Sequence, residues 1–317
     1  MANSTAHDRM RLGTAPDSWG VWFPDDPAQI PWDRFLDEVA AAGYSWIELG
    51  PYGYLPTDPG RLADELGHRG LRLSGGAVFA GLHRGPEALA QAIEDCRIEA
   101  ELLTALGAEY LVLLPEIYSE LDGTLNQPTD LTVEQRSTLH SGMSQLGKVV
   151  AEDFGAKLVF HPHADSHVGT QTEVERFLAD TDPATVALCL DTGHISYYGG
   201  DNVELIRKYP ERIGYVHLKQ VDPALVQRVE REGLAFAEAV RLGVMVEPPT
   251  GVPAMGPVLD ALAALDADLF AVVEQDLYPC DVTVPAPIAR RTREYFGGCG
   301  LYTDSRPPSE RKPEVRP

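Results

Sequence analysis

VALCLDTGH, residues 186–194, is an apolar run that ends on an aspartate and then turns. Three more runs in the second half of the chain have the same form: VFHPHADSH (159–167), YVHLKQ (215–220) and VVEQD (272–276). A buried strand gains no stability from ending on His or Asp, because burying such a group is costly unless it is paired. Side chains at neighbouring strand ends converge at the mouth of a parallel barrel. The four endings therefore predict one shared divalent-metal site at such a mouth.

The whole chain alternates short apolar segments with helical patterns. Its 317 residues, 44% of them hydrophobic, are enough for one α/β barrel with extensions, and no linker divides them. The predicted strands are apolar, as expected when both faces are covered; they span residues 12–15, 46–49, 71–75, 110–114, 157–160, 186–190, 213–217 and 270–273. The predicted helices span residues 32–42, 59–69, 86–106, 132–154, 172–179, 202–209, 258–265 and 286–296. This alternation predicts a single-domain (β/α)8 TIM barrel.

Glycines mark the ends of the first three predicted helices. Gly43, Gly70 and Gly107 stand where a left-handed residue is needed before the chain turns into a strand. No GxGxxG follows the first strand, which argues against an open dinucleotide-binding sheet. We expect a flexible N-terminus over residues 1–10, a barrel over 11–300 and, because SRPPSERKPEVRP lacks apolar periodicity, a disordered tail over 301–317.

The charge and composition narrow the range of partners. A net charge of −22 argues against nucleic acid, whose binding depends on Lys and Arg. No stretch approaches the roughly 18 apolar residues of a membrane helix, and the beginning does not resemble a signal peptide. We therefore expect a cytoplasmic protein without a membrane partner. The four cysteines form no CxxC pair, which favours free thiols over a thiolate metal site.

Three strand endings supply metal-ligand candidates. Asp191 follows an apolar run, although its carboxylate could instead cap the following turn. Glu274 follows the run FAVV, where a carboxylate without a cation would be costly to bury. His217 ends GYVH and would by itself suit a core position. Taken together, the three predict a metal site.

The fourth ligand comes from His161 or His163. Both follow the run LVF, but Pro162 between them interrupts a continuing strand. We prefer His161 as the ligand and His163 as a group that faces the substrate, and the reverse assignment stays open. Five of the nine histidines lie between residues 161 and 217; the other four, which we expect to be solvated, are His7, His68, His83 and His140.

Several motifs resemble the xylose isomerase-like TIM barrels, a family of sugar isomerases, epimerases and dehydratases. They are FHPHADSHVGTQ (160–171), LCLDTGHISYYGGD (188–201), IGYVHLKQVDP (213–223) and VVEQD (272–276). The likeness runs from GTAPDSWG (13–20) through YSWIELGPYGYLP (44–56) to GVPAMGPVLDAL (251–262), and so covers nearly the whole barrel. Within the family the sequence is most similar to the inosose dehydratase branch.

This resemblance implies a divalent ion, Mn²⁺ or Co²⁺ above all, with Zn²⁺, Fe²⁺ and Mg²⁺ as alternatives. Most members hold it with Glu, Asp, His and Glu; Asp191, His217 and Glu274 match three of these, and His161 stands where the first Glu is expected. The dehydratase branch is His-rich at this point, so the departure favours that branch. The resemblance also implies a small polyol or sugar substrate, and a homo-oligomer because such barrels often associate.

The leading hypothesis is a carbon–oxygen lyase that dehydrates an inosose-like cyclic polyol ketone. A divalent ion beside the ketone would stabilise the enediolate left when the α-proton is removed. A dehydratase then expels the β-hydroxyl, whereas an isomerase or epimerase, the alternative, returns the proton elsewhere. A nuclease of this fold would need a basic groove, and a non-catalytic sugar-binding barrel is a further alternative.

Four residues are candidates for proton transfer: His163, His194, Lys219 and Glu48. Histidine titrates near neutrality, although His194 could instead orient a ligand. Lys219 would hold a substrate oxygen or stabilise the enediolate, with a surface lysine as the alternative. Glu48 ends the run WIE on the second strand and so fits the mouth of the barrel.

The pocket is expected to include Trp19, Trp22, Tyr52 and Gln275. Aromatic rings pack against the C–H faces of sugars, although a structural wall or a subunit contact is the alternative. The insertion containing VMVEPPTGVPAM (244–255) is longer than a usual βα loop. We expect it to form a lid or an interface.

Overall fold

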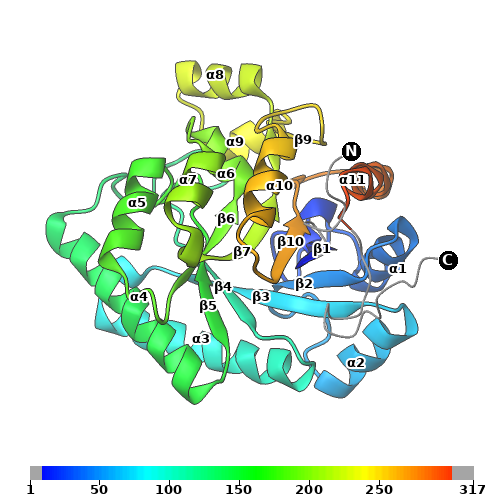
Figure 1. Ribbon diagram of the computed structural model, residues 1–317, viewed down its shortest axis with the longest axis horizontal. Helices are drawn as coiled ribbons and strands as arrows, with labels where there is room; N and C mark the ends of the chain where they lie inside the picture. Colours follow the sequence, from blue (N-terminus) through cyan, green and yellow to red (C-terminus); the bar gives the residue numbers. More distant parts are fainter. Residues whose placement is uncertain (1–8, 302–317) are drawn as a thin grey trace.

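A closed barrel of eight parallel strands forms the centre of the structure, a computed structural model that describes residues 9–301 (Figure 1). The strands are β1 (Met10–Thr14), β2 (Trp46–Pro51), β3 (Arg72–Ala80), β4 (Tyr110–Pro115), β5 (Lys157–Phe160), β6 (Ala187–Asp191), β7 (Ile213–Leu218) and β10 (Leu269–Val273). They close in the order β1-β10-β7-β6-β5-β4-β3-β2. The predicted TIM barrel is confirmed, and each predicted strand overlaps an observed one.

Helices surround the barrel, and every predicted helix overlaps an observed one. The helices are α1 (Trp32–Ala42), α2 (Pro59–His68), α3 (Pro86–Ala105), α4 (Val133–Asp153), α5 (Gln171–Asp180), α6 (Thr192–Tyr197), α7 (Asn202–Lys208), α8 (Pro223–Glu232), α9 (Phe236–Arg241), α10 (Met255–Ala263) and α11 (Pro285–Gly298). The short helices α6, α8 and α9 were not predicted. Gly43, Gly70 and Gly107 have φ values of 90°, 68° and 77°, which confirms the predicted left-handed turns.

The ends of the described chain are packed against the barrel. β1 begins at Met10, two residues before the predicted strand, and Leu301 is fully buried. The remaining residues of the predicted flexible N-terminus and disordered tail lie outside the described residues. Among the described helices, none is long and apolar enough to cross a membrane.

The interior of the barrel is a packed layer of side chains beneath the mouth. Its members include Val112, Val159, Cys189, Tyr215 and Val272. Along a strand, alternate residues face the same side. The residue two positions after an inward-facing core residue therefore also faces inward, one layer closer to the mouth. This relationship links four pairs: Val159 to His161, Cys189 to Asp191, Tyr215 to His217 and Val272 to Glu274.

The insertion after β7 builds a separate cover. Strands β8 (Gln220–Val221) and β9 (Met245–Val246) pair antiparallel, and α8 and α9 lie between them in the chain (Figure 1). The cover has its own apolar cluster, in which Phe236, Val240 and Met245 pack with Ala164 and Tyr197 of the barrel loops. The insertion is therefore anchored next to the β5 and β6 strand ends.

Two histidines that we expected in solvent are buried. His83 and His140 are 8% and 5% exposed, so that prediction is wrong for both. His140 packs against Phe177 and bonds to Asp180, and His83 bonds to Gln127. His68 is exposed as expected, and His7 lies outside the described residues. None of the four cysteines, all of them among the described residues, forms a disulfide, as predicted; Cys96 and Cys189 are buried, whereas Cys280 and Cys299 are half-buried.

Candidate active site

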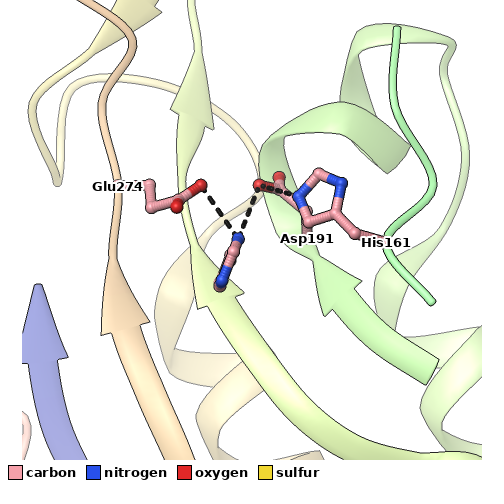
Figure 2. A group of neighbouring side chains, drawn as sticks. His161, Asp191 and Glu274 are labelled. Atoms are coloured by element: carbon pink, nitrogen blue, oxygen red, sulfur yellow. Dashed lines mark hydrogen bonds and ion pairs between the residues drawn. The ribbon is translucent and has the colours of Figure 1, made fainter. Parts of the chain in front are cut away.

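Four side chains from four neighbouring strand ends converge at the mouth of the barrel. They are His161, Asp191, His217 and Glu274, and one ligand atom from each lies within 4.8 Å of those of the others. Figure 2 shows His161, Asp191 and Glu274 pointing toward a common centre. The structure thus brings together all four predicted ligands, with His161 rather than His163 in the group.

The donor set fits a divalent cation. His217 Nε2 lies 2.6 Å from Oε1 of Glu48, which holds a proton on that nitrogen. Nδ1 faces two carboxylates, 2.9 Å from Glu274 Oε2 and 3.8 Å from Asp191 Oδ2, yet it is buried without a hydrogen-bond partner. Burial opposes protonation, but Cys189 and Glu274 raise the pKa of His217 well above its usual value. A divalent cation would take the place of the Nδ1 proton among these carboxylates, and two nitrogens with two carboxylates suit Mn²⁺, Co²⁺, Fe²⁺ or Zn²⁺.

Asp191 caps α6 and also faces the cluster. Its Oδ1 accepts hydrogen bonds of 2.8 Å from the backbone N–H groups of Gly193 and His194, and so caps α6. Its Oδ2 faces the cluster, 3.3 Å from His161 Nε2. Burial opposes ionisation, but Lys219 and His161 hold the pKa of Asp191 below its usual range. One carboxylate therefore caps the helix and stays ionised beside the cluster.

Lys219 is not a surface lysine but is 2% exposed. Its Nζ lies 2.9 Å from Asp276, 3.0 Å from Glu274 and 3.2 Å from Asp191. Burial would lower the pKa of Lys219, but these carboxylates raise it well above its usual value. Thr192 donates its hydroxyl to the Lys219 carbonyl and accepts from the Lys219 N–H, which fixes the backbone. The ammonium is thus a fixed positive charge beside the candidate metal ligands.

His163 and His194 lie beside the cluster and are oriented by the same residue. His163 Nδ1 donates to the carbonyl of Ala164 at 2.6 Å, whereas His194 Nδ1 accepts from the Ala164 N–H at 3.1 Å. Burial and His161 lower the pKa of His163 to about 3. Burial, His163 and Lys219 lower the pKa of His194 well below its usual value. Both rings are therefore neutral at pH 7.

A cavity of about 310 Å³ lies above these groups. Trp22 lines it, as predicted, and stacks on Tyr278 with ring centroids 5.0 Å apart. The other three predicted pocket residues do not line this cavity. Trp19 is buried in the core, where its Nε1 donates to Glu38 and its ring packs on Phe35.

Tyr52 and Gln275 are also placed away from the cavity wall. Tyr52 is 38% exposed after β2, and Gln275 donates its amide to the Met245 carbonyl of the insertion. Successive side chains of an extended segment point to opposite sides. Glu274 and Asp276 therefore face the cavity, whereas Gln275 between them faces the insertion after β7.

Two carboxylates that line the cavity beside Lys219, Asp17 and Asp276, were not predicted. Burial and Glu274 raise the pKa of both, and Asp17 Oδ1 is buried without a hydrogen-bond partner. A signal was present, because Asp17 follows β1 and Asp276 follows β10 as the ligands follow their strands.

A third missed residue, Asp165, joins the two segments that cover the cavity. Its Oδ2 accepts from the Ser119 hydroxyl at 2.6 Å and from the Phe236 N–H at 2.8 Å. Ser119 lies in the segment after β4, Phe236 begins α9, and both line the cavity. Asp165 adopts a φ of 55°, and its own N–H donates to Tyr198. No local motif announced this contact, because its partners are 46 and 71 residues away.

Comparisons with known proteins agree with this architecture. An inosose dehydratase from Geobacillus thermodenitrificans is 31% identical over 93% of this chain and 99% of that protein. One from Clostridium botulinum is 28% identical over 91% and 97%. Among solved structures, the IolI protein with a binding zinc atom has a TM-score of 0.69 and 18% identity, over 92% of this chain and 98% of that chain.

The probable 3-DHS dehydratase AsbF from Bacillus anthracis has the same TM-score, 0.69, with 15% identity over 91% of this chain and 99% of that chain. At such identities the two structures support the fold alone. The profile described as xylose isomerase-like TIM barrel matches residues 36–295. The chain belongs to the xylose isomerase-like TIM barrel family.

Proposed function

We propose that this protein is a divalent-metal-dependent dehydratase acting on an inosose-like cyclic polyol ketone. The observation that carries the proposal is the buried set of two histidines and two carboxylates beneath a ligand-sized cavity. The inosose dehydratase from Geobacillus thermodenitrificans, aligned over 93% of this chain, supports the same reaction class.

His161, Asp191, His217 and Glu274 would hold the ion. When bound, it would polarise the ketone and stabilise the negative charge that develops when the α-proton leaves. We propose Mn²⁺ or Co²⁺, although the donor set also accepts Zn²⁺, the metal in the IolI structure. Glu48, a catalytic candidate from the sequence, would act through His217 by fixing the proton on Nε2.

His163 is placed to act as the general base and His194 as the general acid. Because His163 Nδ1 is bound to a carbonyl, its Nε2 carries a lone pair that can accept the α-proton. Because His194 Nδ1 accepts an N–H, its proton resides on Nε2. As the β-carbon–oxygen bond breaks, that proton joins the departing hydroxyl, and water leaves.

Lys219 would bind the oxygen that becomes negatively charged. Its Nζ lies 3.4 Å from His194 Nε2, and both groups are hydrogen-bond donors. Two donors so close together do not satisfy each other, and an oxygen between them would accept from both. This arrangement supports a substrate oxygen at that point.

The test is to incubate 2-keto-myo-inositol with the protein and Mn²⁺. A dehydratase generates a conjugated dione with ultraviolet absorbance. Consumption of the ketone without absorbance would instead indicate the isomerase or epimerase, which shares the first proton transfer. An unchanged ketone would contradict both.

A pair of variants assigns the activity to this site. Asp191→Asn should abolish turnover and weaken Mn²⁺ binding in calorimetry, because it removes a charged ligand. Asp64→Asn, on the exposed surface of α2, is the matched control and should change neither. Full turnover in Asp191→Asn would reject the proposed site.

A further inference from the structure

The cavity has a polar floor and an apolar upper wall. The floor carries three of the four candidate ligands, with His163, His194 and Lys219 beside them. The upper wall is formed by large apolar side chains: Trp22, Phe23, Phe79, Leu114, Leu121 and Phe236. They come from β3 and β4, from the segments that follow β1 and β4, and from α9.

Part of the apolar wall is open to solvent. Phe79, Leu121 and Phe23 are 53%, 41% and 37% exposed. Phe79 and Leu114 are partners in the β3–β4 register, so they lie side by side on one surface of the cavity. Exposed apolar side chains that are contiguous with a pocket mark a surface that a ligand covers.

The charges of the cavity disfavour an anionic ligand. Asp17, Glu48, Glu120, Glu274 and Asp276 line it, whereas Lys219 is the only Lys or Arg among the described residues that does. Three of these five carboxylates lie within 4 Å of that ammonium, so its charge is already compensated. A phosphate or carboxylate group would therefore meet net negative charge.

An unsubstituted inosose would suit only half of this cavity. Its hydroxyls surround the whole ring, and the floor can bind those near the ketone. Hydroxyls on the far edge would lie against Phe79, Leu114 and Leu121, whose side chains offer no hydrogen-bond partner. An apolar group at that edge would instead be favourably buried.

We propose that the substrate is an uncharged cyclic polyol ketone that carries an apolar substituent, aromatic or alkyl, on the ring edge opposite the ketone. The ketone binds at the polar floor, and the substituent packs against the apolar wall at Phe79, Leu114 and Leu121. This assignment rests on the proposed dehydratase chemistry and specifies its substrate class.

The test compares 2-keto-myo-inositol with its benzyl ether on the oxygen opposite the ketone. Wild-type protein loaded with Mn²⁺ is assayed with each of the two compounds for α-proton exchange in D₂O and for elimination. The ether should have a kcat/KM at least about tenfold higher, the factor expected when a group on the order of 100 Å² is buried. Exchange of the parent ketone with no preference for the ether overturns this inference alone, whereas no exchange with either compound overturns the proposed function itself.

Variants of the wall locate the preference. Phe79→Ser and Leu121→Asn should each lower the ratio of kcat/KM for the ether to kcat/KM for the parent ketone. This ratio does not depend on the fraction of folded protein. Val133→Ser, 72% exposed at the start of α4, is the matched control and should leave the ratio unchanged. Light scattering of the same proteins tests whether a second copy of the chain, instead of a substituent, covers the apolar wall. A dimer that becomes a monomer in Phe79→Ser while the ratio stays constant would overturn the inference.

Discussion

The imidazole rings of His163 and His194 lie 4.1 Å apart and hydrogen-bond to opposite backbone groups of the same residue, Ala164. The carbonyl fixes a proton on one Nδ1, and the N–H requires a lone pair on the other. His163 Nε2 therefore carries a lone pair, whereas His194 Nε2 carries a hydrogen. Because burial lowers the pKa of both rings, this acceptor and donor coexist at pH 7.

His163→Gln should remove the base while leaving the metal ligands in place. We expect kcat to fall by about 10²–10⁴-fold, with α-proton exchange in D₂O lost in parallel. His194→Asn should retain exchange but lose elimination, because it removes only the proton for the leaving hydroxyl. NMR of the ketone in D₂O separates the two steps, and wild-type exchange in His163→Gln would contradict the assignment.

Asp165→Asn should loosen the two segments that cover the cavity, because it weakens the bonds to both Ser119 and Phe236. Asn tolerates the φ of 55° as Asp does, so the backbone is preserved. We expect KM to rise by about tenfold with Mn²⁺ affinity unchanged. Ser119→Ala removes one of the two bonds and should have a smaller effect. A fall in kcat alone would argue against a positioning role.

Glu48→Ala should weaken the metal site through His217, whose Nε2 proton it leaves without an acceptor. Metal affinity measured by calorimetry should fall by about 10–100-fold. Glu48→Gln keeps an accepting oxygen and should recover most of this loss. Normal metal affinity combined with lost turnover in Glu48→Ala would restore the direct catalytic role that the sequence suggested.

Glu99 of α3 makes the stability depend on pH. Its carboxyl is buried beside Gly76, Oε1 has no hydrogen-bond partner, and burial raises the pKa well above its usual value. Above a pH of about 4.5 the unfolded chain releases this proton while the folded protein retains it, so stability falls as pH rises. The Tm of Glu99→Gln minus that of wild type should therefore grow between pH 5 and 8. Glu101→Gln, which is exposed on the same helix, is the control, and a constant difference would refute the explanation.

The barrel and the four-residue cluster were predictable because both follow from the alternation of side chains along a strand, in which every second residue faces the same side. His217 lies two residues after Tyr215 of the barrel interior, so a sequence pattern already contains the geometry. The positions of Trp19 and Trp22 could not be predicted from such a pattern. They are three residues apart around a 3-10 turn, and only the packing of Trp19 on Phe35 determines which one faces the cavity. Asp165 was beyond reach because its two partners lie 46 and 71 residues away along the chain.

Lys219 gives the site a counterion that is covalently part of the chain. Its ammonium, within 3.2 Å of three carboxylates, keeps Asp191 and Glu274 in place by attraction. A metal ion would therefore enter a preformed site and could leave without the barrel having to refold. The folded protein should consequently exchange one divalent ion for another, and the supply of metals in the cell, rather than the ion present during folding, would decide which one it carries.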